Sequence, residues 1–65
     1  MNTERAASII SLLEKYSYIS VQDLANLLHA STPTVRRWLS ELEREGIVVR
    51  NHGGVILAGN GLPKP

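Results

Sequence analysis

The run Ala30-Ser31-Thr32-Pro33-Thr34-Val35-Arg36-Arg37-Trp38-Leu39 combines the start of a helix with two helix faces of opposite character. Ser31 is a good N-cap, because its hydroxyl can accept a hydrogen bond from a backbone N–H of the first turn. Pro33 fits the first turn, where its missing N–H is not needed. The sequence therefore predicts a helix that begins after Ser31 and ends before Gly46, the residue type expected just past a helix end.

The two faces predict what each side of this helix contacts. The apolar stripe follows the spacing of a buried helix face and consists of Val35, Leu39 and Leu42, with Trp38 at its edge. The opposite side carries Thr34, Arg36 and Arg37. Arginine can donate two hydrogen bonds to guanine, and small hydroxyl side chains let a helix approach the bases closely. We interpret this segment as the recognition helix of a helix-turn-helix.

Composition limits the class of protein. A chain of 65 residues forms one domain at most, and without cysteine it has neither a disulfide nor a cysteine-based zinc site. No stretch is long and apolar enough to span a membrane, and no basic-then-apolar leader precedes the domain, so a cytoplasmic protein is expected. The net charge is only +1, but its distribution is informative, because the acidic residues group at the far end of the recognition helix. Those residues are Glu41, Glu43 and Glu45.

The residues before the turn predict a first, scaffold helix. It is capped by Asn2 or Thr3 and runs for about three to four turns, given its amphipathic spacing. Its apolar positions are Ala6, Ile9, Ile10, Leu13 and Tyr16. Residues 16–19 then break the helical pattern, and their aromatic and β-branched side chains suit a short extended segment.

A capping box predicts the start of the second helix. Ser20 caps this helix and Asp23, three residues later, reaches back to it, while Ile19 and Leu24 form a hydrophobic staple. The apolar positions that follow are Leu24, Ala25, Leu27 and Leu28. Residues 28–30 form the turn to the recognition helix, where His29 occupies a place in which glycine is common and backbone strain is expected.

Two β-rich runs follow the recognition helix. Residues 47–50 and 55–58 are separated by the glycine-rich tip 51–54, which predicts a β-hairpin, and the extended segment near Ile19 can pair at its edge. The expected fold is mainly α with a small β-hairpin, a winged helix-turn-helix of three helices plus a wing over residues 1–58. Residues 59–65 are dominated by glycine and proline and are interpreted as a linker toward a further domain.

Three groups of residues are candidate DNA contacts. The recognition helix supplies hydroxyls and arginines, and which arginine reads a base and which holds a phosphate stays open. The second helix can present its N-terminus to a phosphate. The hairpin can place its tip on a phosphate or in the minor groove, although turn chemistry explains Asn51 equally well. The full set is Ser20, Gln22, Ser31, Thr32, Pro33, Thr34, Arg36, Arg37, Arg50, Asn51 and His52.

An ordered set of residues between Arg5 and Leu57 resembles the N-terminal DNA-binding domain of the DeoR family of bacterial transcriptional regulators. The matching positions are Arg5, Ile9, Leu13, Ser31, Thr34, Val35, Arg36, Arg37, Leu39 and the tip His52-Gly53-Gly54. The resemblance implies a repressor of sugar or nucleoside catabolism genes that binds a double-stranded DNA operator. It also implies a C-terminal effector domain, absent from these residues, that binds a phosphorylated sugar and forms a homo-oligomer.

The chain departs from this family at Trp38, where an Asp usually follows the paired arginines. If Arg5 or Arg37 normally pairs with that carboxylate, it needs another partner here, and Glu41 lies four residues after Arg37. Trp38 can pack at the edge of the core with its N–H in water, the interpretation we favour, or contact the DNA backbone.

Other classes of function make different predictions. A winged helix that binds only protein would suit the near-neutral net charge and the acidic end of the recognition helix. An enzyme is not expected, because no acid/base pair, cysteine nucleophile, phosphate loop or metal cluster is recognisable, and no cofactor is predicted. The favoured function is therefore sequence-specific DNA binding without catalysis.

Overall fold

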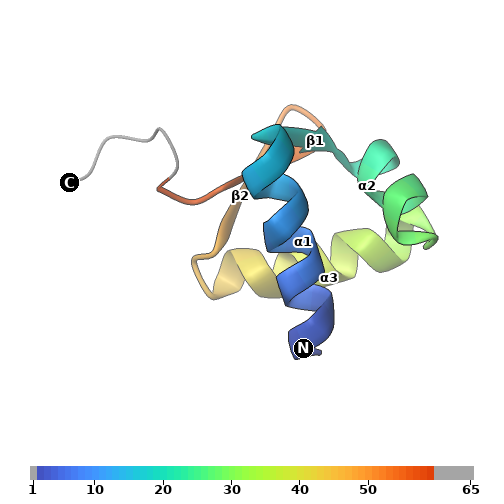
Figure 1. Cartoon of the computed structure of the whole chain (residues 1–65), viewed down its shortest axis with the longest axis horizontal. Coiled ribbons are helices and arrows are strands. Elements are labelled where there is room, and N and C mark those ends of the chain that lie inside the picture. Colours follow the sequence, from blue (N-terminus) through green and yellow to red (C-terminus); the bar gives the residue numbers. More distant parts are fainter. Residues whose placement is uncertain (1, 60–65) are drawn as a thin grey trace.

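The computed structural model describes residues 2–59 and contains three helices and a small antiparallel sheet (Figure 1). In chain order the elements are α1 (Thr3–Tyr16), β1 (Tyr18–Ser20), α2 (Val21–Leu28), α3 (Thr32–Arg44), β2 (Val48–Asn51) and β3 (Gly54–Leu57). This arrangement confirms the predicted winged helix-turn-helix. Of the predicted linker, all but Gly59 lies outside the described residues, so the boundary at residue 58 stays a prediction.

Each helix begins at a side-chain cap. Asn2, rather than Thr3, caps α1, because its Oδ1 accepts hydrogen bonds from the backbone N–H groups of Glu4 and Arg5 at 2.7 and 3.2 Å. Ser20 Oγ accepts the Asp23 N–H at 3.0 Å at the start of α2. Within residues 2–59 the Asp23 carboxylate does not reach back, so only half of the predicted capping box forms. The Asp23 side chain is exposed, so water hydrates its carboxylate in place of the Ser20 N–H.

The sheet has the order β1-β3-β2, and the extended segment near Ile19 joins the edge of the hairpin as predicted. The hairpin turn is shorter than the predicted tip 51–54. It contains only His52 and Gly53, whose φ angles of 51° and 77° are both left-handed. Two central residues with positive φ define a type I′ turn, whose twist matches that of the two strands. Asn51 and Gly54 are therefore strand residues that face each other.

The core lies where the three helices and the sheet meet, and it contains the predicted stripe of α3. Its buried residues are Ile9, Leu13, Ile19, Val21, Leu24, Ala25, Val35, Leu39, Leu42, Val48 and Val55. The turn between α2 and α3 contains His29 with a left-handed φ of 55°, as expected for a residue in a position that favours glycine. No helix among the described residues is long and apolar enough to cross a membrane.

Two apolar residues assigned to buried stripes lie at the surface instead. Tyr16 is 51% exposed and Leu27 is 47% exposed. Tyr16 is the last residue of α1, and the chain turns away at Ser17, whose φ is 68°. Within residues 2–59 the core therefore covers α1 as far as Leu13, which is fully buried, and leaves Tyr16 at the surface although it continues the apolar spacing. Tyr18 is a strand residue, as expected, but its side chain is 44% exposed.

The wing depends on the small size of Gly54. A Cβ at Gly54 would lie 2.6 Å from Cε2 of Tyr18 and closer still to Cζ and Oη, too close for any real contact. Gly54→Ala is therefore expected to lower the free energy of unfolding by about 1–3 kcal/mol, as measured by urea denaturation. In a Tyr18→Ala background the same substitution should cost much less, because the ring is gone. An equal cost in both backgrounds would show that the ring is not the obstacle.

Candidate nucleic-acid interface

The first turn of α3 is ordered by hydroxyl groups. Ser31 Oγ accepts the Thr34 N–H at 3.4 Å and donates to Thr34 Oγ1 at 2.8 Å, while Pro33 occupies the first turn. Ser31 and Pro33 are exposed, and Thr32 and Thr34 are half-buried. The predicted cap is confirmed, and all four side chains surround the N-terminus of the helix, where backbone N–H groups and the helix dipole favour a phosphate.

Removing the Ser31 hydroxyl tests this cap. Ser31→Ala is expected to lower the free energy of unfolding by about 1 kcal/mol, because one N–H of the first turn loses its acceptor. Ser40→Ala, at an exposed position later in the same helix, is the matched control and should be close to neutral. Urea denaturation of both variants measures the difference, and equal stabilities would contradict the capping role.

Arg36 and Arg37 are exposed in the first half of α3. Within residues 2–59, neither side chain forms a hydrogen bond, an ion pair or a ring contact, so both guanidinium groups are available to a ligand. No ion pair between Arg37 and Glu41 is found within residues 2–59. The acidic residues Glu43 and Glu45 are exposed at the opposite end of the helix. The first half of α3 thus carries positive charge only, whereas its end carries these acidic residues together with Arg44.

The sheet brings together two residues from different segments that are predicted to contact DNA. Ser20 and Asn51 both pair with Gly54, on its two sides, and the Val21 N–H donates to the Gly53 carbonyl at 3.0 Å. The tip of the wing is therefore attached to the N-terminus of α2. A further hydrogen bond, from the Tyr18 hydroxyl to the His52 carbonyl at 3.0 Å, fixes the turn.

The remaining predicted contacts lie at the surface around this group. Gln22 is exposed on the first turn of α2, and Arg50 and His52 are exposed on the hairpin. The hydroxyl of Ser20 serves as the cap of α2. Whether these side chains contact DNA stays a prediction.

One contact was not foreseen from the sequence. The guanidinium carbon of Arg5, on α1, lies 3.8 Å from the centroid of the Trp38 ring on α3. Trp38 is half-buried and packs against the core, which confirms the favoured interpretation of this residue. Because Trp38 stands where the family usually has Asp, the resemblance indicated that Arg5 could need a different partner. A sequence pattern does not reveal which residues of two neighbouring helices are in contact.

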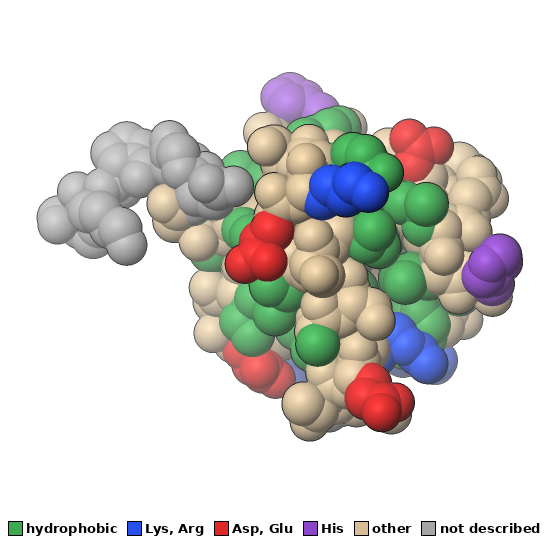
Figure 2. Space-filling model, in the orientation of Figure 1, with side chains coloured by type: hydrophobic (Ala, Val, Ile, Leu, Met, Phe, Trp, Pro, Cys, Tyr) green, Lys and Arg blue, Asp and Glu red, His purple; other side chains and the backbone are tan. Residues whose placement is uncertain are grey.

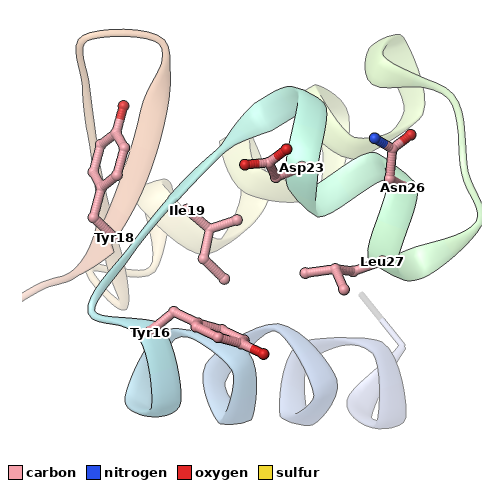
Figure 3. Close-up of a pocket in the computed structure, with 6 residues that line it drawn as sticks. All are labelled: Tyr16, Tyr18, Ile19, Asp23, Asn26 and Leu27. Atoms are coloured by element: carbon pink, nitrogen blue, oxygen red, sulfur yellow. The ribbon is translucent and has the colours of Figure 1, made fainter.

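The face of the molecule that carries α1 differs from the first half of α3 in its distribution of charge. Acidic and basic side chains are scattered over it, with apolar patches between them (Figure 2). A shallow groove lies between the end of α1, β1 and α2, and the side chains of Tyr16 and Leu27 enter it from opposite sides (Figure 3). Among the described residues there is no cluster that could hold a metal ion.

The second and third helices joined by a tight turn, followed by a hairpin packed against the second helix, define a winged helix-turn-helix domain. The family model of the DeoR-like helix-turn-helix domain matches residues 5–60. The chain therefore belongs to the DeoR family of transcriptional regulators, and residues 5–60 form the helix-turn-helix domain of that family.

Several curated relatives are transcriptional regulators. The chain is 44% identical over 54 residues to the uncharacterized HTH-type transcriptional regulator FruR of Bacillus subtilis, which covers 83% of this chain and 22% of that protein. It is 33% identical over 63 residues to the glycerol-3-phosphate regulon repressor of Escherichia coli, with 97% and 25% covered.

The putative galactitol utilization operon repressor of Escherichia coli is 44% identical over 59 residues, which covers 88% of this chain and 53% of that protein. The chain thus spans between about a quarter and a half of the length of these relatives. No solved structure matches the chain. The comparisons support a regulator that binds DNA and give no support to the protein-only alternative.

Proposed function

We propose that this chain is the operator-binding domain of a repressor that controls genes of sugar metabolism. The observation that carries the proposal is the pair of exposed, unpaired guanidinium groups of Arg36 and Arg37 on a helix whose other face is fixed in the core. The names of the relatives, which include repressors of glycerol-3-phosphate and galactitol genes, supply the class of target.

In this proposal DNA is bound in three places. The first half of α3 enters the major groove, where Arg36, Arg37 and Thr34 contact base edges and phosphates. The N-termini of α2 and α3 approach the backbone with Ser20, Gln22, Ser31, Thr32 and Pro33. The wing places Arg50, Asn51 and His52 on an adjacent phosphate or in the minor groove. Because the Val21 N–H donates to the Gly53 carbonyl, the N-terminus of α2 and the tip of the wing keep a fixed spacing.

The rest of the regulatory device would lie in a further domain of the whole protein. The family resemblance implies that this domain binds a phosphorylated sugar and joins copies into an oligomer. Two copies would then read half-sites separated by about one helical turn of DNA or a multiple of it. Such a repressor acts in the cytoplasm, where bacterial DNA lies.

The salt dependence of DNA affinity tests the proposal. Fluorescence anisotropy with a labelled duplex of random sequence should show affinity that falls linearly on a log–log plot against salt concentration, because bound phosphates release counterions. A protein-binding winged helix would show no such affinity at low salt. Selection from a library of random duplexes with the oligomeric protein would then identify the operator.

A further inference from the structure

We propose that Arg5 is a phosphate-binding residue of the DNA interface, and that Trp38 orients its guanidinium. This inference rests on the proposed function and adds a residue from α1, a helix that otherwise serves as scaffold. Arg5 is half-buried, and its guanidinium carbon lies 3.8 Å from the centroid of the Trp38 ring.

The stacked geometry determines which part of Arg5 can act. A guanidinium that stacks on an aromatic ring uses the face of its plane, whereas its N–H donors point outward within that plane. Stacking therefore fixes the direction of the donors without using them. A planar fork of donors held in this way matches the geometry of a phosphate group.

The position of Trp38 on α3 places Arg5 near the DNA backbone in the proposed complex. Trp38 follows Arg37 directly and lies one turn after Thr34, between the buried stripe and the exposed face. It thus occupies the flank of the helix. A helix with its side chains is about 10–12 Å wide and the major groove is about 12 Å wide, so the flanks of a recognition helix approach the phosphates that line the groove. The guanidinium of Arg5 lies over the Trp38 ring and is therefore on this flank of α3.

A matched pair of substitutions distinguishes a phosphate contact of Arg5 from a general effect of net charge on DNA affinity. Arg5→Gln removes one positive charge near the start of α1, and Lys15→Gln removes one near its end, about 15 Å away along the helix axis. Lys15 also lies beside an aromatic ring, 5.3 Å from the centroid of Tyr16, but far from α3. The two variants therefore have the same net charge, and each removes a cation that lies beside an aromatic ring.

The readout is the affinity for a labelled duplex of random sequence, measured by fluorescence anisotropy over a range of salt concentrations. Arg5→Gln should weaken binding about tenfold at low salt and reduce the slope of log affinity against log salt by about 1, whereas Lys15→Gln should leave the slope unchanged. Arg5→Lys should restore the slope but only part of the affinity, because lysine keeps the charge and loses the planar fork.

Two outcomes would overturn the proposal while leaving the proposed function intact. One is an Arg5→Gln variant that is less stable in urea but has the slope of the unmodified protein, which would assign Arg5 a structural role only. The other is an equal change of slope in Lys15→Gln, which would indicate a non-local charge effect. If the unmodified protein shows no salt-dependent affinity, the proposed function fails, and the role of Arg5 fails with it.

Discussion

Alanine at both Arg36 and Arg37 is expected to weaken DNA binding about a hundredfold or more while leaving the domain folded. Each guanidinium that holds a base edge or a phosphate contributes about 1–3 kcal/mol, and the slope of log affinity against log salt should fall by about 2. Both side chains are exposed and form no hydrogen bond, ion pair or ring contact within residues 2–59, so the fold does not need their guanidinium groups. Fluorescence anisotropy measures the affinity, and circular dichroism checks the fold.

The control for this experiment removes the same charge elsewhere. Lys15→Ala together with Arg44→Ala changes the net charge equally but leaves the first half of α3 unmodified, since Arg44 is in the last turn of that helix. This control should retain most of the affinity. If the Arg36 and Arg37 variant binds as tightly as the unmodified protein, α3 is not the recognition helix.

Val35→Asp is expected to unfold the domain. Val35 is fully buried in the first half of α3 and packs in the centre of the core. A carboxylate there would lose its hydration without gaining a partner, and leaving a charge buried and unpaired costs several kcal/mol. A core in a domain of this size rarely supplies more than about 3–5 kcal/mol of stability, so the loss exceeds what is available.

Thermal melting followed by circular dichroism measures this effect. Ser40→Asp introduces the same charge on the exposed side of the same helix and should melt close to the unmodified protein. A cooperative, native-like melting curve for Val35→Asp would show that α3 is rotated relative to the arrangement described above.

The elements of the fold follow from local signals in the sequence. The caps at Ser20 and Ser31 are short-range, because a hydroxyl and the N–H it accepts are three residues apart. Gly46 has a left-handed φ of 79° just past α3, as predicted. The buried stripe of α3 was also predictable, because a helix packed along its length keeps the same period throughout.

The surface was less predictable, because it depends on how far one element covers another. Tyr16 continues the apolar period of α1, but the neighbouring elements do not extend over it. The contact between Arg5 and Trp38 joins residues 33 positions apart, and local periodicity carries no information about such pairs. The attachment of the wing to Val21 depends in the same way on the register of β1 with β3.

An NMR titration of the isotopically labelled protein with a short duplex of random sequence tests the central claim most directly. At low salt, the backbone signals of residues 31–38 and 50–54 should shift, and the shifts should fade at moderate salt as counterions compete for the phosphates. Signals at the groove beside Tyr16 and Leu27 should stay in place. If residues 31–38 do not shift at low salt, or if the shifts are confined to that groove, α3 does not bind DNA in the way described.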